Sequence, residues 1–252
     1  MYLYLYDVFL KRRQFERPIA AVETRLTDFG LSGKVARLAA FANPRRLVQE
    51  EMRSGAKTIV IVGDDTTFAK VVGRIADLGL VIGWIPLGAS VKFAELLGIP
   101  YGDAACETLS QRRISQIDIG IVNGRLFIGS VHIPPSNFSF NLDGQYNVKS
   151  IDQKMELWVA NLDRRHVLGL IPKGAANPSD GQLEVVVRPV TRSGFFGKHL
   201  ARPTFMPFQH LTVEAHHAVP LEVDGITFKE KRVVIALAPK SLRCIVGKKR
   251  KF

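Results

Sequence analysis

The feature that most constrains the fold is the segment 58–72, an apolar run followed by a polar turn and a helical pattern. Four of the five residues in 58–62 are β-branched aliphatics, which predicts a strand buried on both faces. The polar turn 63–67 follows directly. Apolar residues then stand at positions 68, 71, 72 and 75, the spacing of one helix face. The segment therefore predicts a strand, a short turn and a helix in succession.

A turn of this kind lies where open parallel sheets bind their ligands, just beyond the carboxyl end of a strand. The free N–H groups and the dipole of the following helix favour an anionic ligand there. The alternative is an ordinary connection in which Asp and Thr serve only as helix caps. The segment by itself is compatible with both interpretations.

A second segment, 80–100, has the same layout of strand, Gly-containing turn and helix. Upstream, residues 2–10 predict a first strand, and 35–41 could form a second. Asn43 and Pro44 have the residue types of a helix start, and that helix would run to Gly55. Alternating strands and helices predict an α/β domain with a doubly wound parallel sheet.

The pattern changes near residue 114, after which short alternating runs separated by turn residues replace helical periodicity. Asn123-Gly124 between two such runs predicts a hairpin with a type I′ turn. Further strands are predicted at 154–160, 183–190, 210–215, 219–223, 226–228, 232–237 and 242–246. We expect two domains, 1–110 and 111–252. The second would be a β-sandwich, and its C-terminal tail could return to the first domain.

These segments resemble the catalytic domain of the diacylglycerol kinase and sphingosine kinase family, which is related to NAD kinases. The family's G-G-D-G-T turn corresponds to 63–67, which here reads Gly-Asp-Asp-Thr-Thr. Its second motif, I-P-x-G-T-x-N-D-F-A-R-x-L-G-I-P, is matched at 85–88, 93–94 and 97–100.

The resemblance extends into the C-terminal half. Ile117–Gly120 and Asn123–Phe127 match I-D-L-G-x-x-N-G-R-x-F, and Val223-Asp224-Gly225 matches the start of V-D-G-E. A P-x-A-x-x-D-G-x-L-D/E-V element is matched at Pro172, Ala175, Asp180, Gly181, Leu183, Glu184 and Val185.

Membership of this family implies transfer of a phosphoryl group from ATP, with Mg²⁺, to a lipid hydroxyl such as that of diacylglycerol, in a ligand cleft between the two domains. The resemblance implies a base at Asp224; the alternative there is a plain hairpin turn without chemistry. The nucleotide-binding positions that it implies are Gly63, Asp64, Asp65, Thr66, Thr67, Gly88, Ala89 and Ser90.

Several positions depart from the family pattern. Asp64 replaces a Gly, and two adjacent carboxylates at 64 and 65 would repel a triphosphate unless a metal ion lies between them. Thr66 replaces another Gly, at a position where a positive φ could be required. Ile226 removes the last carboxylate of V-D-G-E, and residues 7–17 lack the family's N-P-x-S-G turn.

These departures leave two hypotheses, an active lipid kinase and a catalytically inactive relative that binds nucleotide, lipid or a protein partner. Lys70 and Lys92 could compensate by supplying positive charge to the phosphates. An NAD kinase-like activity is disfavoured, because the Asn-Glu pair expected after the turn is missing.

The net charge of +12 requires an anionic partner or a solvated basic surface. The basic residues are spread along the chain except at Lys248–Lys251, and no nucleic-acid motif is present, so nucleic acid is not expected. An anionic membrane surface is expected instead, which would place a cytoplasmic protein at the membrane periphery. The alternative is that the basic tail is simply solvated. A homodimer is a further possibility.

No apolar run reaches the length of a membrane span. The two cysteines and the histidines at 210, 216 and 217 lack the spacing of a metal site.

Overall fold

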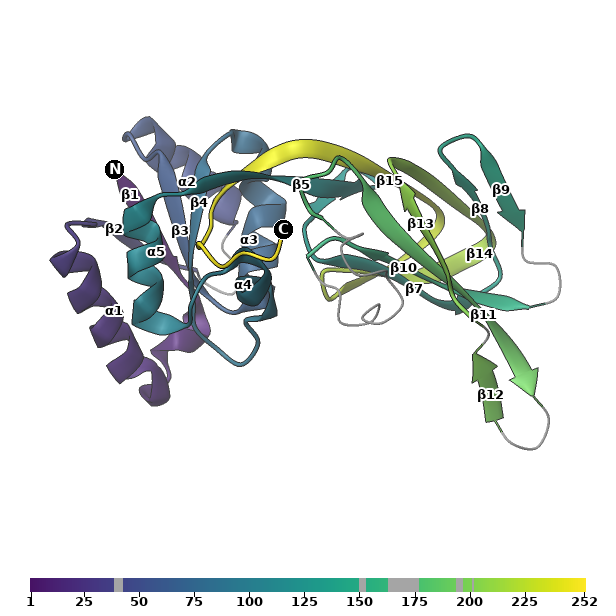
Figure 1. Cartoon of the computed structure of the whole chain (residues 1–252), viewed down its shortest axis with the longest axis horizontal. Coiled ribbons are helices and arrows are strands. Elements are labelled where there is room, and N and C mark those ends of the chain that lie inside the picture. The colour runs from purple at the N-terminus through teal and green to yellow at the C-terminus, as the bar shows by residue number, and fades with distance from the viewer. Residues whose placement is uncertain (39–42, 150–152, 163–176, 194–196, 201) are drawn as a thin grey trace. The chain divides into compact units, whose positions relative to one another are not determined.

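The computed structural model describes residues 1–38, 43–149, 153–162, 177–193, 197–200 and 202–252 (Figure 1). The chain divides into two compact units, one of residues 1–117 with 240–252 and the other of residues 118–239. We call them the first and second units. Two expectations, the matches at Pro172 and Ala175 and the end of the possible strand 35–41, lie outside the described residues.

The first unit is built on a parallel sheet with the strand order β2-β1-β3-β4-β15. Its strands are β1 (Tyr2–Tyr6), β2 (Gly33–Arg37), β3 (Thr58–Gly63), β4 (Val81–Pro86) and the end of β15 (Ile226–Ile245). Its helices are α1 (Glu16–Asp28), α2 (Pro44–Arg53), α3 (Asp65–Ile75), α4 (Lys92–Leu97) and α5 (Ala105–Gln111). Short 3₁₀ turns are η1 (Val8–Lys11), η2 (Arg13–Phe15), η3 (Ala76–Leu78) and η4 (Gly102–Ala104). The predicted doubly wound parallel sheet is confirmed.

This strand order determines where a ligand is expected. From β1 the chain passes through α1 to the edge strand β2, and then returns through α2 to β3 on the other side of β1. The carboxyl ends of β1 and β3 therefore lie side by side at the point where the winding direction reverses. Open α/β sheets bind ligands at such a switch point.

The central βα unit forms as its sequence predicts. All six residues of β3 are buried, and α3 turns Phe68, Val71, Val72 and Ile75 into the core. Phe68 stacks on Trp84 with ring centroids 4.5 Å apart, and the Trp84 indole N–H donates to the carbonyl of Gly63 at 2.9 Å. The predicted cap of α2 is also confirmed, since the Asn43 side chain accepts from the N–H of Arg45.

Two helices were not predicted from the sequence, α1 and α5. Helix α1 buries only Val22 and Leu26 along its 13 residues, so its apolar residues are too few to form a recognisable helical pattern. Helix α5 has seven residues, too few for a periodic pattern to be recognised.

The second unit is β-rich and antiparallel, as predicted. Asn123 and Gly124 have φ values of 45° and 78°, the left-handed conformations of the expected hairpin turn. Its buried core includes Val131, Leu157 and Leu211. Its strands are most of β5 (Ile114–Val122), then β6 (Arg125–Phe127), β7 (Ser130–Ser136), β8 (Ser139–Leu142), β9 (Tyr146–Lys149), β10 (Lys154–Ala160), β11 (Leu183–Ser193), β12 (Gly197–Leu200), β13 (Thr204–Phe208), β14 (His210–Val223) and most of β15.

Some predicted short strands are parts of longer ones. The runs 210–215 and 219–223 form the single strand β14, whose register shifts between Glu214 and Val219. The last three predicted strands are all parts of β15.

The C-terminal tail is bonded to the first unit along α4. Gly247 N donates to the carbonyl of Leu97 and Lys251 N to that of Leu96, both at 2.9 Å. A Cβ on Gly247 would lie 1.7 Å from the carbonyl oxygen of Gly98, so only glycine fits this crossing. Residues 248–251 thus have a fixed backbone and exposed side chains.

In the described part of the chain, no helix has the length and apolarity needed to cross a bilayer.

Candidate functional site

The turn after β3 places Asp64 at the start of α3. Asp64 is the N-cap of that helix, and its Oδ1 accepts from the backbone N–H of Thr67 at 3.0 Å. The Thr67 hydroxyl lies 3.0 Å from the same Oδ1 and 2.7 Å from Oδ2 of Asp7, which directly follows β1. The Thr67 hydroxyl therefore lies within hydrogen-bond distance of two carboxylates, at the ends of β1 and β3.

Asp65 points the other way, into the connection between β4 and α4. Its side chain is buried and accepts from Ser90 Oγ at 2.6 Å, Lys92 N at 2.8 Å and Phe93 N at 3.0 Å. Its own N–H donates to the carbonyl of Ser90 at 2.8 Å. Asp65 thus connects the turn after β3 to the turn after β4 by hydrogen bonds. The sequence predicted that two adjacent carboxylates would repel a triphosphate. In the structure only Asp64 faces solvent, because Asp65 is buried.

Gly88 lies against Asp64 across the two turns. Its φ is +133°, and a Cβ there would lie 2.8 Å from the Asp64 Cβ and 3.1 Å from the Phe9 ring. The backbone conformation and the close approach both require glycine at this position. The N–H of Gly88 donates to the Tyr101 hydroxyl at 3.4 Å.

A cavity of about 550 Å³ opens at this edge of the sheet. It contains three of the sequence-predicted positions, Asp64, Gly88 and Ala89. Gly63, Asp65, Thr67 and Ser90 form the hydrogen-bonded support behind them. The lining residues are Phe9, Arg12, Gln14, Phe15, Pro18, Asp64, Gly88, Ala89 and Tyr101.

Five of these lining residues come from the segment 9–18, which was not predicted from the sequence as part of the site. The segment contains most of η1 and all of η2, and it occupies the position where the family's N-P-x-S-G turn would follow β1. Only its place directly after the first strand could have indicated it, because it carries no recognisable motif.

The other departures are placed differently. Thr66 lies exposed in the first turn of α3 and is absent from the positive-φ residues, so the expected need for a left-handed conformation was wrong. Lys70 and Lys92 are exposed, and neither is among the residues that line the cavity.

Asp224 lies in the second unit, in the two-residue turn between β14 and β15. Its Oδ2 accepts from Ile128 N at 3.0 Å, and its Oδ1 accepts from Gly129 N at 2.8 Å and Ser130 N at 2.9 Å. These bonds fix the turn to the start of β7. The three bonds give Asp224 a structural role at this turn.

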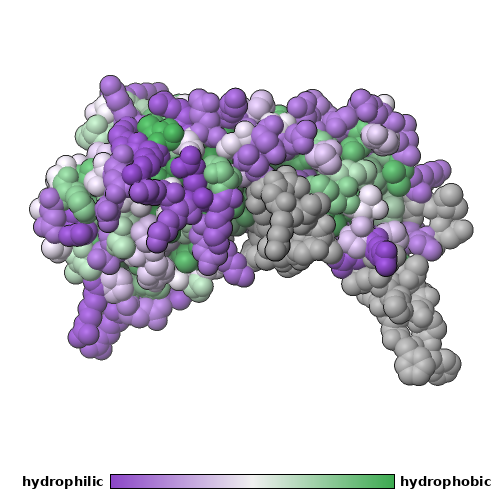
Figure 2. Space-filling model, viewed as in Figure 1, coloured by the Kyte–Doolittle hydropathy of each residue, from purple (hydrophilic) through white to green (hydrophobic). Residues whose placement is uncertain are grey.

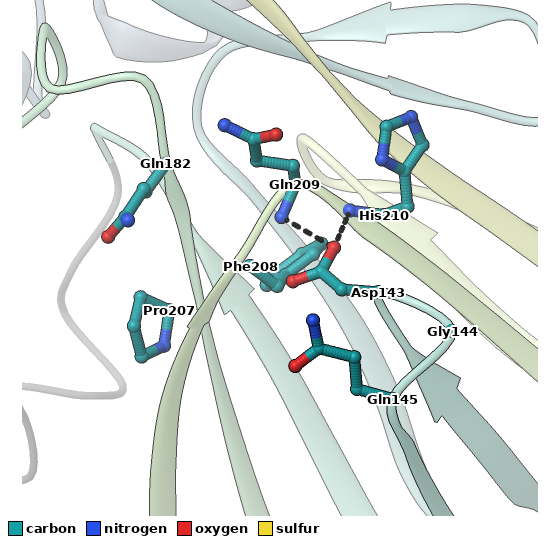
Figure 3. A pocket seen from close by; sticks show the side chains of 8 residues that line it. All are labelled: Asp143, Gly144, Gln145, Gln182, Pro207, Phe208, Gln209 and His210. Carbon is teal, nitrogen blue, oxygen red and sulfur yellow. Dashed lines mark hydrogen bonds between the residues drawn. The ribbon is translucent and has the colours of Figure 1, made fainter.

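A second cavity, of about 590 Å³, lies in the second unit (Figure 3). There Asp143 Oδ1 accepts from the backbone N–H groups of Gln209 at 3.0 Å and His210 at 2.7 Å. None of the sequence-predicted site residues lines this cavity, and its carboxylate is already paired. Within the described residues, no group of three or more His, Cys, Asp or Glu side chains could hold a metal ion.

The fold is that of a chain with two compact units and, at the carboxyl edge of its parallel sheet, two linked turns beside a cavity. Residues 5–122 match the family model of the diacylglycerol kinase catalytic domain. The chain is 38% identical over 88 residues to a probable lipid kinase YegS-like of Pseudomonas aeruginosa strain UCBPP-PA14, covering 33% of this chain and 28% of that protein. It is 29% identical over 128 residues to the diacylglycerol kinase of Bacillus subtilis strain 168, covering 49% of this chain and 42% of that protein.

Each of these sequence matches therefore spans less than half the length of the relative. The crystal structure of a diacylglycerol kinase from Bacillus anthracis str. Sterne superposes with a TM-score of 0.76, at 18% identity, over 99% of this chain and 97% of that one. A putative diacylglycerol kinase from the same organism gives a TM-score of 0.77 at 16% identity, over 99% and 98% of the two chains. Together the matches confirm the resemblance: the chain is homologous to the YegS-like lipid kinases and to diacylglycerol kinase, and it has the diacylglycerol kinase fold.

Proposed function

We propose that the protein is a lipid kinase that transfers a phosphoryl group from ATP to a lipid hydroxyl such as that of diacylglycerol. The observation that carries this proposal is the pair of turns at the carboxyl ends of β3 and β4, which Asp65 joins beside a cavity at the switch point. A cavity in that position of a doubly wound sheet is typical of nucleotide binding. The lipid acceptor is inferred from the names of the homologous proteins.

The residues present fit a magnesium ion brought in by the nucleotide. Mg²⁺ is commonly held by one or two carboxylates together with substrate phosphates. Asp64 has Oδ1 engaged by Thr67, while no donor among the described residues bonds its Oδ2, so Asp64 would hold the ion. When bound, the ion would neutralise phosphate charge. For Asp224 we propose the role of base, in competition with a purely structural role at the turn.

A second candidate is a relative that binds ligands without turnover. Two observations favour it. Asp64 places a negative charge at the N-terminus of α3, and Ile226, half exposed beside the Asp224 turn, stands where the family has Glu.

We further propose that the protein works at an anionic membrane surface on the cytoplasmic side. The net charge of +12 supports this, as do the exposed side chains of Lys248–Lys251 on their fixed backbone. Figure 2 shows hydrophilic residues over much of the visible face; because its colours do not separate basic from acidic side chains, the net charge and the basic tail carry this proposal. Basic residues near an anionic leaflet contribute about 1 kcal/mol each.

The test begins with calorimetric titration of ATP, with and without Mg²⁺, followed by phosphorylation of diacylglycerol in anionic vesicles. Micromolar binding and transfer of radiolabelled phosphate to lipid are expected. Binding without transfer would leave the non-catalytic relative. Neither heat nor a thermal shift at millimolar ATP would overturn both nucleotide-dependent proposals.

A further inference from the structure

In the proposed nucleotide site, two backbone donors that face a phosphate are already bonded to the protein's own oxygen atoms. The N–H of Thr67 is bonded to the Asp64 carboxylate at 3.0 Å, and the N–H of Gly88 is bonded to the Tyr101 hydroxyl at 3.4 Å. The positive end of the α3 dipole therefore already carries an anion. A phosphate approaching that helix end would meet the charge of Asp64.

Arg12 brings the opposite charge to the same cavity. It is the one basic residue in the lining, and its side chain is exposed. Among the described residues, no side chain or carbonyl forms an ion pair or hydrogen bond with its guanidinium. Its backbone is held nonetheless, because Arg12 N donates to the carbonyl of Phe9 at 3.1 Å. The cation is thus positioned by the chain and available to a ligand.

The remaining wall of the cavity is largely apolar. Phe9 and Phe15 pack edge to face with ring centroids 5.4 Å apart, and Pro18 and Tyr101 complete this side. Aromatic rings and a guanidinium that forms paired hydrogen bonds with phosphate oxygens are the groups that recognise a nucleotide.

From this charge arrangement we infer that Arg12, and not the N-terminus of α3, holds the phosphates of the nucleotide, and that Asp64 excludes them from the helix. The inference rests on the proposed nucleotide-dependent function. Phosphate binding, which the family pattern places at the turn 63–67, is thereby assigned to Arg12 in the segment after β1. The negative charge of Asp64 at the helix end and the cation of Arg12 in the same cavity then belong to one arrangement of the site.

The experiment measures ATP affinity by calorimetry in EDTA, so that no metal ion masks the charge of Asp64. Arg12→Gln should weaken binding about ten- to hundred-fold, the usual effect of losing a charge-assisted hydrogen bond. Arg13→Gln is the matched control, since Arg13 is exposed next to Arg12 and does not line the cavity. Asp64→Asn should tighten binding several-fold, because Asn keeps the helix cap and removes only the charge. Asp28→Asn, at the opposite end of α1, controls for net charge.

The outcomes distinguish a failure of this inference from a failure of the proposed nucleotide-dependent function. Weaker binding by Arg12→Gln and tighter binding by Asp64→Asn, with both controls unchanged, would support it. Wild-type binding that neither Arg12→Gln nor Asp64→Asn alters would overturn the inference and leave the nucleotide-dependent function standing. No binding by any variant would overturn both. Adding Mg²⁺ should reduce the gain in Asp64→Asn, whereas an undiminished gain would contradict the proposed role of Asp64 in holding the ion.

Discussion

The hydroxyl of Thr67 lies 2.7 Å from Oδ2 of Asp7, and this contact joins the carboxyl ends of β3 and β1. The two residues are 60 positions apart in the chain. The same hydroxyl lies 3.0 Å from Oδ1 of Asp64, so the Thr67 side chain contacts two carboxylates of the candidate site.

Thr67→Val removes this hydroxyl while keeping the branched shape of a buried side chain. We expect the free energy of unfolding to fall by about 1–3 kcal/mol, because two partly buried carboxylates lose a donor. Urea denaturation measures the change. Thr66→Val, at the exposed neighbouring position, should change stability by less than about 0.5 kcal/mol. Equal effects at the two positions would contradict the bridging role of Thr67.

Asp65→Asn tests the connection between the two turns. An Asn side chain has one acceptor oxygen, so at least one of the N–H groups of Lys92 and Phe93 loses its partner in a buried place. We expect a loss of about 2 kcal/mol and weaker ATP binding, since Gly88 and Ala89 would no longer be held. Asp77→Asn breaks only an exposed ion pair with Arg45 and should cost less than about 1 kcal/mol. Unaltered stability of Asp65→Asn would show that the turns do not depend on it.

Asp224→Asn distinguishes a structural role of Asp224 at its turn from the proposed role as base. Loss of the charged acceptor for three backbone N–H groups should lower stability by about 1–3 kcal/mol. Glu214→Gln, on the same strand and in an exposed ion pair, is the control. If Asp224 is the base, lipid phosphorylation should vanish at temperatures where the variant is fully folded. Activity that falls only with the folded fraction would assign Asp224 a structural role alone.

The two cysteine thiols should make stability depend on alkaline pH. Burial raises the pKa of Cys106 to about 11 and that of Cys244 to about 12, from an ordinary value of 9.0. A raised pKa means that the folded state holds its proton more tightly than the unfolded state. The stabilisation is therefore complete below pH 9 and is lost as pH rises through the folded values. Thermal unfolding between pH 8 and 11 would show the decline.

The same burial predicts slow alkylation of both thiols. With iodoacetamide at pH 8, the native protein should react far more slowly than the urea-unfolded chain, because the thiolate is the reactive form. Equal labelling rates in the two states would contradict the burial of these thiols.

Sequence reasoning succeeded where the information is local. The apolar run of β3, the Asn43 cap and the Asn123-Gly124 turn each depend on a few adjacent residues, and the structure confirms all three. It failed for α1, whose stability comes from packing rather than from a strong pattern of its own. It also divided β14 and β15 into several short strands, because polar positions within a long exposed strand resemble turn residues.

The sequence by itself determined the succession of elements, the family resemblance and the two turns that face the ligand edge of the sheet. Only the tertiary structure decided that Asp64 and Asp65 point to different places, that Asp7 meets Thr67 and that Arg12 lines the cavity. The physical reason is that the direction of each of these side chains is set by hydrogen bonds and packing between strands far apart in the chain. Such contacts exist only once the parallel strands have assembled in the order β2-β1-β3-β4.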